Sequence, residues 1–437
     1  MTPSTGYEDG AVLPDAVQRL EAKAFRSRLI AAAVGGLALR LAWWWHAQPE
    51  PVSDFEWLRR LAESLLDHHQ YGFPRLEGGK PPAYPILLAG LMLISRSTAW
   101  LSFVTVLISA ALVPLVGVLA RRLGLGTSAA IGSAWICAFN PTFVFFAPVL
   151  ATEHLFSAML LAALVVVVGM TAATRGRAAN FAGALFGVAT LARVDALFYL
   201  PVLVAVIWIH PVPGRLRSIA ALILVAGMVV TPWYLRNRTV IGAGAGLSTA
   251  GGATFYHAHH DGPYGWRSLV GTPLEGVHQL ELHQRGYELG FAYIRRVGVR
   301  GVLRDMLIAT GQQYSPLTSP YAIGFSTRQA GPNPDEFTAR PVAGARALGW
   351  VNAAGYGVLL IVALGSVFFA RRLPGVALVV LYGIVLMNWL AHCWVYLGGG
   401  RYRYVAEVAF CILAAVTITS VRSRKSDHLP QTMHRTC

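Results

Sequence analysis

The sequence predicts an all-α polytopic membrane protein, and both its composition and its patterning carry this prediction. Of its 437 residues, 55% are hydrophobic and 13% are charged, and its mean hydropathy is +0.51. Soluble domains carry about 25% charged residues, so this chain lacks the polar surface that coats a soluble globule. Its apolar residues fall in runs of about 20, the length at which a helix crosses a bilayer. The 44 Gly and 24 Pro form no repeat, which excludes collagen-like and disordered chains.

We predict about ten membrane-spanning helices. They cover residues 27–46, 99–119, 127–147, 155–173, 178–194, 196–212, 218–235, 347–369, 374–396 and 405–421. Residues 82–94 are also apolar, but this stretch is short and prolines interrupt its start. It could be a span or a helix that lies at the membrane interface.

The placement of basic residues decides between these topologies. The net charge of +15 is spread over small clusters between the apolar runs, chiefly Arg121–Arg122, Arg175 with Arg177, Arg215 with Arg217, and Arg371–Arg372. If 82–94 does not cross, all four clusters lie on the same side as both termini, as the positive-inside rule expects of the cytoplasmic face. The pattern fits a multi-pass protein of a cell membrane, with a bacterial inner membrane favoured. It does not fit a nucleic-acid-binding surface, so we expect no nucleic-acid partner.

This topology divides the chain into five parts. They are a cytoplasmic segment (1–26), an N-terminal transmembrane module (27–235), a long outer loop (236–346), C-terminal transmembrane helices (347–421) and a basic cytoplasmic tail (422–437). The N-terminal module carries two further outer loops, 47–98 and 148–154. Because the substantial loops share one face, we expect chemistry at the outer surface. The four Cys have no spacing typical of a disulfide framework or a zinc site.

The first outer loop contains a predicted amphipathic helix. Ser53 with Glu56 three residues later reads as a capping box, and leucines and an alanine follow at helical spacing from Leu58 to Leu66. Such a helix lies on the membrane surface. Asp54 could be a first-turn acid that the helix dipole favours, or a catalytic carboxylate at the membrane boundary. On the pattern alone, the first interpretation is favoured.

The second outer loop places Glu153 and His154 at the start of a very apolar span. An acid at this depth is costly and usually marks a functional site. The alternative is helix capping, with Thr152 as the cap and Glu153 in the first turn. The sequence leaves these two interpretations open.

Several basic residues lie on the predicted outer side, against the charge rule. Lys80 could snorkel to lipid headgroups or hold the phosphate of a lipid-linked substrate. Arg193 with Asp195 could be an ion pair that orients two helices. Arg236 follows Pro232-Trp233, and Arg401 and Arg403 lie in a Gly-Gly-Gly-Arg-Tyr-Arg-Tyr run at the outer end of the last span.

Two features of the long outer loop carry weaker signals. His257, His259, His260 and Asp261 could bind a metal, but such a cluster is more often a solvated loop. Residues 279–309 form a second predicted amphipathic helix with four arginines. It could be a headgroup-binding surface helix or a docking site for an acceptor.

The order of several motifs resembles the GT-C superfamily of polyprenyl-phosphate-sugar-dependent glycosyltransferases. The likeness is greatest to the protein-mannosyltransferase-like and aminoarabinose-transferase-like branch (glycosyltransferase family 39 and relatives). The motifs are Ser53-Asp54, Lys80-Pro-Pro-Ala-Tyr-Pro, Ala151-Thr152-Glu153, Ala189 to Asp195, Thr231 to Asn237, Ser248 to Gly252 and Arg401-Tyr-Arg-Tyr. They run from about residue 50 to 405. Each motif is weak alone, and their shared order is more specific.

The resemblance implies a catalytic aspartate at Asp54 and a second acid at Glu153. Lys80 stands where the family often has arginine, which keeps the charge but loses the bidentate fork. We predict substrate-binding roles for Lys80, Tyr84, His154, Arg193, Asp195, Arg236, Arg401 and Arg403. No cofactor is certain, and a divalent metal is possible.

The expected function is transfer of a sugar from a polyprenyl-phosphate carrier to a glycan, protein or lipid hydroxyl on the extracytoplasmic face. Asp54 would act as general base, and the expected stereochemical course is inversion. The rival interpretation is a lipid-linked-sugar flippase or another transporter. Transporters tend to carry inverted repeats and short loops on both faces, and this sequence shows neither. A non-sugar membrane transferase is less favoured still.

Overall fold

The computed structural model describes residues 15–73, 75–209, 213–262, 264–265, 269–318, 328–329, 339–340 and 344–427. Residues 1–14 of the predicted N-terminal segment and 428–437 of the predicted tail lie outside this set. The first half of the chain contains α1 (Asp15–Ala47), α2 (Asp54–His68), α3 (Ala83–Met92), α4 (Thr98–Arg122), α5 (Gly126–Phe139), α6 (Pro141–Phe146), α7 (Thr152–Val168), α8 (Arg175–Ala192), η1 (Val194–Tyr199), α9 (Leu200–Ile209) and α10 (Arg215–Arg236).

The second half continues the helical architecture. It contains η2 (Asn237–Ile241), α11 (Gly251–Ala258), α12 (Gln279–Tyr314), η3 (Pro316–Thr318), α14 (Ala345–Leu364), η4 (Gly365–Arg372), α15 (Gly375–Trp389), η5 (Leu390–Val395), η6 (Gly400–Arg403) and α16 (Tyr404–Asp427). Two short strands, β1 (Arg328–Gln329) and β2 (Ala339–Arg340), pair antiparallel within the long outer loop. The predicted all-α class is confirmed apart from this minor hairpin.

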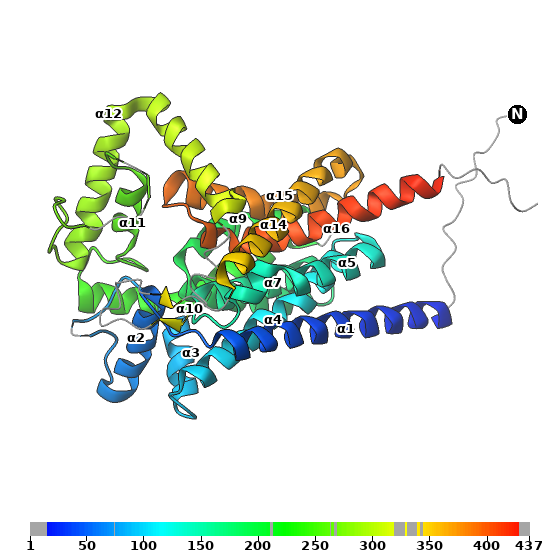
Figure 1. Ribbon diagram of the computed structural model, residues 1–437, viewed down its shortest axis with the longest axis horizontal. Helices are drawn as coiled ribbons and strands as arrows, with labels where there is room; N and C mark the ends of the chain where they lie inside the picture. Colours follow the sequence, from blue (N-terminus) through cyan, green and yellow to red (C-terminus); the bar gives the residue numbers. More distant parts are fainter. Residues whose placement is uncertain are drawn as a thin grey trace, which may run out of the picture.

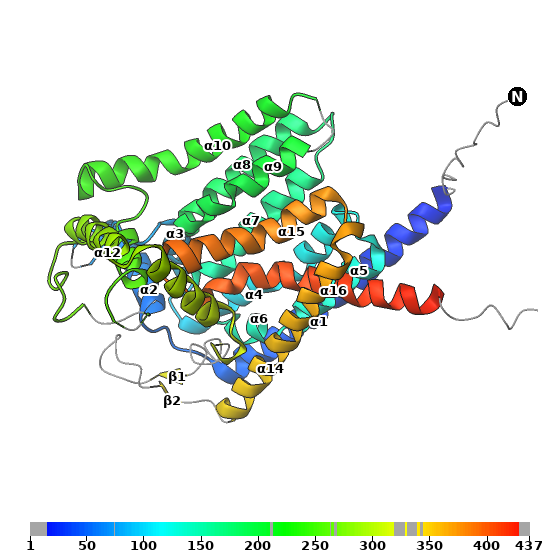
Figure 2. The same cartoon turned by 90° about the horizontal axis from the view of Figure 1, so that it is seen from above.

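The long helices lie side by side in one bundle (Figure 1). Helix α8 packs between α7 and α10, and α16 packs against α5 and α14. Helices α8, α9 and α10 form one side of the bundle (Figure 2). Gly183 and Gly187 explain the close approach of α8 to α10. A Cβ at Gly183 would lie 2.5 Å from the Leu222 carbonyl oxygen, and one at Gly187 would lie 2.7 Å from the Val229 side chain. This is the small-xxx-small packing that holds apolar helices together in a bilayer.

Within the described residues, six helices are long and apolar enough to cross a membrane: Val17–Ala47, Thr98–Arg122, Arg215–Ile241, Ala345–Arg372, Gly375–Val395 and Gly400–Ser423. Four shorter apolar helices are Ala83–Met92, Gly126–Phe139, Thr152–Val168 and Val194–Ile209. Helix α3 has 10 residues, a length of about 15 Å, half the thickness of the hydrocarbon core. That 82–94 does not cross stays a prediction. The total of about ten spans stays a prediction.

The predicted span 127–147 is not one continuous helix. Helix α5 ends at Phe139, and the Asn140 side chain accepts a hydrogen bond from Thr142 N to cap α6, with Pro141 in the first turn. The Asn140 amide nitrogen also donates to Glu407 Oε2 at 3.1 Å. A polar capping residue followed by proline ends one helix and begins the next. Because the residues around this pair are apolar, the sequence predicts a single span.

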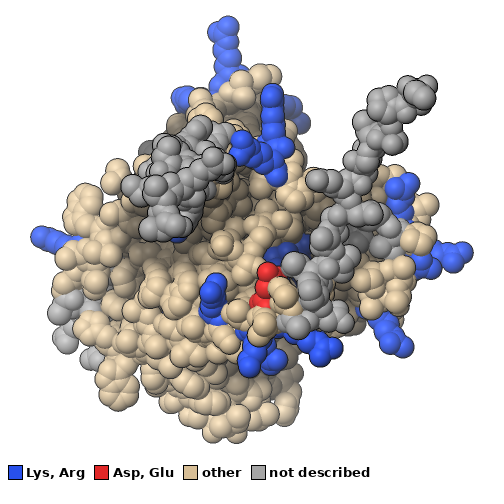
Figure 3. All heavy atoms as spheres, turned by 90° about the vertical axis from the view of Figure 1, so that its right-hand side faces the viewer, with Lys and Arg blue, Asp and Glu red and all other residues tan. Residues whose placement is uncertain are grey.

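The basic connections meet at one end of the bundle. The Arg121 guanidinium lies 4.1 Å from the ring centroid of Phe25, and Arg175 Nη1 donates to the Pro213 carbonyl at 2.8 Å. A Cβ at Gly124 would contact Pro374 at 3.4 Å. The start of α1 and the end of α16 lie at this same end (Figure 1). Figure 3 shows this face rimmed by Lys and Arg with few acidic side chains.

The opposite end holds the helices predicted on the outer face. Helices α2, α11 and α12 gather there (Figure 1). The two predicted amphipathic segments are confirmed as helices, although α12 bends at Gly298, whose φ is 62°. The predicted capping box is wrong. Ser53 has φ 51° and makes no side-chain cap, and Glu56 pairs instead with Arg59 and Arg60, both at 2.9 Å.

We expect cysteine labelling to place the two ends of the bundle on opposite sides of the membrane. Thr127 and Gln70 are both exposed, at the basic end and at the α2 end respectively. In a background with Cys437 replaced by serine, an impermeant maleimide should label Gln70→Cys in right-side-out membranes. It should label Thr127→Cys only after permeabilisation, because the positive-inside rule predicts that the basic end faces the cytoplasm. The reverse accessibility, or equal accessibility of both sites, would contradict this topology.

Candidate functional site

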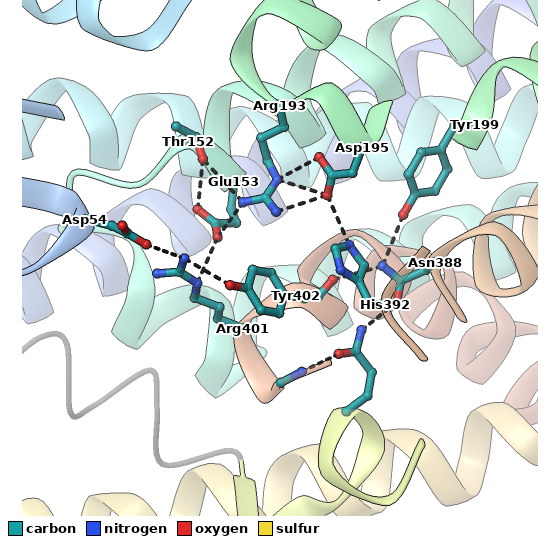
Figure 4. Close-up of polar contacts among 12 residues, drawn as sticks. Asp54, Thr152, Glu153, Arg193, Asp195, Tyr199, Asn388, His392, Arg401 and Tyr402 are labelled. Carbon is teal, nitrogen blue, oxygen red and sulfur yellow. Dashed lines mark hydrogen bonds and ion pairs between the residues drawn. The ribbon is translucent and has the colours of Figure 1, made fainter. Parts of the chain in front are cut away.

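Six of the predicted site residues converge where helix ends meet, at the end of the bundle opposite the basic connections (Figure 4). Each comes from an element terminus or a connection. They are Asp54 at the first position of α2, Lys80 before α3, Glu153 at the second position of α7, Arg193 after α8, Asp195 in η1 and Arg401 in η6.

Asp54 is held between two cations from distant parts of the chain. Its Oδ1 accepts from Lys80 Nζ at 2.6 Å and its Oδ2 from Arg401 Nη2 at 2.7 Å. The positive charge of Lys80 lowers the pKa of Asp54 most; burial opposes this effect, and Arg401 adds to it. The Asp54 side chain is still 38% exposed. It is therefore an ionised carboxylate that a ligand can approach.

Glu153 lies deeper and shares Arg401 with Asp54. Its Oε1 accepts from Arg193 Nη1 at 2.9 Å and lies 3.6 Å from Arg401 Nε. The Thr152 hydroxyl donates to Glu153 Oε2 at 3.3 Å. Thr152 is not the helix cap, because the capping position belongs to Ala151, which has no side-chain cap. The interpretation of Thr152 as the cap is therefore wrong, while Glu153 does lie in the first turn.

Asp195 completes the network. Arg193 Nε donates to Asp195 Oδ1 and Arg193 Nη2 to Oδ2, both at 3.0 Å, so this ion pair is bidentate. His392 Nε2 lies 3.0 Å from Asp195 Oδ2. The His392 ring stacks on Tyr402 with centroids 4.9 Å apart and planes 5° from parallel. The predicted Arg193–Asp195 ion pair is present, and the contact between His392 and Asp195 ties η1 to η5.

His392 was not among the predicted site residues. It lies inside the predicted span 374–396, and an ionisable residue in a span is a signal of function. The structure adds a second signal, because His392 lies in η5, which is a π-helix. Such local irregularities are frequent at functional sites.

The network alternates in charge along its length. Lys80, Asp54, Arg401, Glu153, Arg193 and Asp195 follow one another through contacts of 2.6 to 3.6 Å. Three cations and three carboxylates balance one another when His392 is neutral. Balanced pairing is what makes ionised groups tolerable in a poorly hydrated site. At the exposed end, two cations flank a carboxylate, so a phosphate and a hydroxyl could both be bound there.

Arg236 supports the loop that carries Lys80. It donates to the backbone carbonyls of Glu77 and, at 3.1 Å, Tyr71, and its guanidinium lies 4.8 Å from the Trp233 ring centroid. The Glu77 carboxylate in turn accepts from Lys80 N at 3.3 Å. The structure thus gives Arg236 protein partners on this loop, and its substrate contact stays a prediction.

The other three predicted residues lie in the core. Tyr84 is fully buried and pairs with Thr105 Oγ1 at 3.1 Å. His154 is fully buried beneath Glu153, with its ring nitrogens 2.9 Å from Tyr404 Oη and 3.0 Å from the Phe146 carbonyl. Arg403 is 1% exposed and pairs with Glu407 at 2.8 Å. The Tyr84 and His154 contacts join different helices, whereas Arg403 and Glu407 are four residues apart in one segment. A substrate role for the three residues stays a prediction.

The histidine cluster is buried, so its interpretation as a solvated loop is wrong. His257, His259 and His260 are 0%, 4% and 5% exposed, and burial lowers the pKa of His259. Asp261 pairs with Arg296. Among the described residues, no group of three or more His, Cys, Asp or Glu is arranged to hold a metal ion. Asp54 and Glu153 already face cations, so the residues present do not fit a metal site.

Comparison with known proteins establishes the fold. No family model and no curated protein matches the sequence. Among solved structures, the chain is similar to the archaeal oligosaccharyltransferase AglB from Archaeoglobus fulgidus, in complex with an inhibitory peptide and a dolichol-phosphate. The likeness covers 95% of this chain and 53% of AglB at 14% identity and a TM-score of 0.53. The chain therefore shares the fold of the aligned part of AglB and spans about half of the length of AglB.

Two further likenesses are weaker. ArnT from Cupriavidus metallidurans, bound to undecaprenyl phosphate, is 15% identical, with 92% of this chain and 81% of ArnT covered and a TM-score of 0.42. The arabinosyltransferase EmbB from Mycobacterium smegmatis is 13% identical, with coverages of 95% and 42% and a TM-score of 0.34.

We expect the buried part of the network to be important for stability. Asp195→Asn should lower the free energy of unfolding by about 3 kcal/mol, because Arg193 loses half of its buried charge compensation. Thermal unfolding in detergent micelles measures this. The matched control is Asp67→Asn, which breaks an exposed pair with Arg96 and should change stability little. Equal losses in the two variants would show that the Asp195 pair is no more important than a surface contact.

Proposed function

We propose that this protein is a membrane glycosyltransferase that moves a sugar from a polyprenyl-phosphate-linked donor to an acceptor hydroxyl on the extracytoplasmic face. The observation that carries the proposal is the geometry around Asp54, an exposed carboxylate held between Lys80 and Arg401. These groups supply the two functions that the reaction needs. The carboxylate accepts a proton, and the cations bind a phosphate.

The reaction would proceed by direct displacement. The acceptor oxygen attacks the anomeric carbon of the sugar, its proton passes to Asp54, and the bond between the sugar and the phosphate oxygen breaks. The electron pair of that bond leaves with the polyprenyl phosphate. Lys80 and Arg401 would stabilise the charge that develops on the departing phosphate. No nucleotide is required, because the lipid phosphate is itself the leaving group.

Inversion is the expected course because Asp54 is the one exposed carboxylate among the three acids of the network. Glu153 is 4% exposed and is engaged by Arg193, so it is badly placed to attack the sugar. Its proposed role is to hold Arg401 from the side opposite Asp54. A retaining mechanism through a covalent intermediate would need a second exposed carboxylate beside the sugar.

Donor binding would also activate the base. In the ligand-free site, both oxygens of Asp54 are occupied by cations, and its pKa lies well below the usual range. A phosphate that takes a share of Lys80 and Arg401 removes part of that stabilisation. The pKa of Asp54 then rises, and the carboxylate becomes a stronger base when the donor is present.

The fold supports this assignment over a transporter. The linked charges lie at the ends of helices or in connections between them, whereas transporters bind their cargo near the midplane between broken helices. The lipid tail of a donor would extend from the site along the apolar helices into the bilayer. The proposed acceptor is a hydroxyl group of a glycan, a protein or a lipid.

The decisive experiment is transfer from a labelled polyprenyl-phosphate sugar in membrane vesicles. We expect Asp54→Asn to fold, because Asn retains the shape and hydrogen-bonding capacity of Asp. Its turnover should fall by about 10²–10⁴, the usual share of a general base. Glu56→Gln is the matched control, since Glu56 lies in the same turn of α2 and its carboxylate pairs with Arg59 and Arg60, outside the charge network of the site. Wild-type turnover by a folded Asp54→Asn protein would exclude Asp54 as the base.

The pH dependence should differ between kcat/KM and kcat. The acid limb of kcat/KM reports the free enzyme, where the pKa of Asp54 lies below its ordinary value of 3.8. Activity is therefore retained as pH falls to that value and is lost only when Asp54 gains a proton. The acid limb of kcat reports the donor complex and should lie at higher pH, because bound phosphate shares the cations. The opposite order of the two limbs would contradict the proposed activation.

A further inference from the structure

The segment Gly398–Tyr404, which carries Arg401, is held in a narrow space by its neighbours. A Cβ at Gly398 would lie 2.7 Å from the His392 carbonyl oxygen, and one at Gly400 would lie 2.5 Å from the Thr318 carbonyl oxygen. Both distances are too short for any side chain, so the glycines allow the backbone to pass. Tyr264 Oη accepts from Gly398 N at 2.7 Å. The position of this backbone is therefore closely determined.

Gln313 binds the segment before Arg401. Its Oε1 accepts from Gly399 N at 2.8 Å, and its Nε2 donates to Asn388 Oδ1 at 3.1 Å. The Gln313 carbonyl accepts from Arg403 Nη1 at 3.0 Å. Gln313 has no exposed surface. One glutamine thus contacts the Gly398–Tyr404 segment on both sides of Arg401.

Asn388 binds the segment after Arg401. Its Nδ2 donates to the Tyr402 carbonyl at 2.9 Å and to Tyr199 Oη at 3.1 Å, and its Oδ1 also accepts from Tyr314 Oη at 2.9 Å. Asn388 has no exposed surface. Both hydrogens and the oxygen of this amide are therefore used, as a buried amide requires.

We propose that Gln313 and Asn388 are positioning residues that hold Arg401 in reach of both Asp54 and Glu153. The inference rests on the proposed function, in which Arg401 binds the donor phosphate. Arg401 must place one guanidinium 2.7 Å from Asp54 and 3.6 Å from Glu153 at once. Its own backbone lies between Gly399 N and the Tyr402 carbonyl, which are the two groups that the amides bind.

This arrangement connects the long outer loop to the site. Gln313 lies in the last turn of α12 (Gln279–Tyr314), which begins in that loop, while Asn388 belongs to α15 (Gly375–Trp389). The orientation of Arg401 thus depends on two helices that contribute no charged group to the network. A displacement of the end of α12 would move Arg401 directly.

The test combines hydrogen exchange with a double-mutant cycle, on the full-length protein in nanodiscs. Gln313→Leu and Asn388→Leu remove the amides with little change in volume. Amide exchange of peptides covering 398–404 should become faster in both variants. Asn352→Leu is the matched control: Asn352 is equally buried and its Oδ1 lies 3.2 Å from Thr142 Oγ1, but its variant should leave exchange in 398–404 unchanged.

The cycle uses undecaprenyl phosphate as the probe, with binding measured by native mass spectrometry. Arg401→Ala should weaken binding about ten- to hundredfold. Asn388→Leu and Gln313→Leu should each weaken it about tenfold or more, since a shift of about 1 Å in a binding group is costly. The double variants with Arg401→Ala should bind no more weakly than Arg401→Ala alone, because the amides act through Arg401.

Losses that multiply in the double variants, or unchanged exchange in 398–404, would overturn the positioning role. If either Gln313→Leu or Asn388→Leu does not fold, the other variant still tests the positioning role, because the two amides bind different backbone groups. If the wild-type protein does not bind undecaprenyl phosphate, the proposed function fails. The exchange measurement then still decides whether these amides hold the segment.

Discussion

The structure depends on one physical constraint, which is that every charge in a poorly hydrated site must have a partner. Taking an ion out of water costs several kcal/mol even after the protein relaxes. The site meets this cost by sharing: Arg401 serves Asp54 and Glu153, and Arg193 serves Glu153 and Asp195. No single helix could provide this alternation. The ends of α2, α7 and α8, together with η1 and η6, must therefore converge, and the packing of the spans is what brings them together.

Several residues of the charge network lie on or next to irregular backbone. Ser53 has φ 51°, a costly value for a residue with a Cβ, immediately before Asp54. Asp195 lies on a 3-10 helix, His392 on a π-helix, and Arg401 follows three consecutive glycines. Sparsely populated conformations persist only where the surrounding structure imposes them, and they cluster at functional sites. Each irregularity here directs a charged or ring side chain toward the same small volume.

The sequence predicts the membrane class and the helical segments, because these depend on composition and local pattern. Local pattern alone leaves the roles of Asp54 and Glu153 undecided, and the resemblance of the motifs singles out these two acids. The outer arginines are recognisable because they break the charge rule. The pairing partners are not predictable in this way. Arg401 and Asp54 are 347 residues apart, and no local signal specifies their contact. Competition between nearby side chains also makes a local prediction fail. Glu56 has the spacing of a capping box, but its carboxylate pairs with Arg59 and Arg60 instead. His392 carries one local signal, an ionisable side chain inside an apolar run, but its contact with Asp195, which is 197 residues away, has none.

Charge balance also constrains how the proposed reaction would end. The ligand-free network is neutral overall, and a polyprenyl-phosphate sugar is a phosphodiester with one negative charge. Transfer creates a phosphate monoester of charge about −1.5 to −2, while Asp54 loses its charge by taking the acceptor proton. The total charge in the site therefore changes little during the chemical step, and no uncompensated ion is created. When the lipid phosphate departs, Lys80 and Arg401 return to Asp54, its pKa falls, and the proton is released to solvent through the exposed side of that carboxylate. The same two cations that bind the donor would thus reset the base.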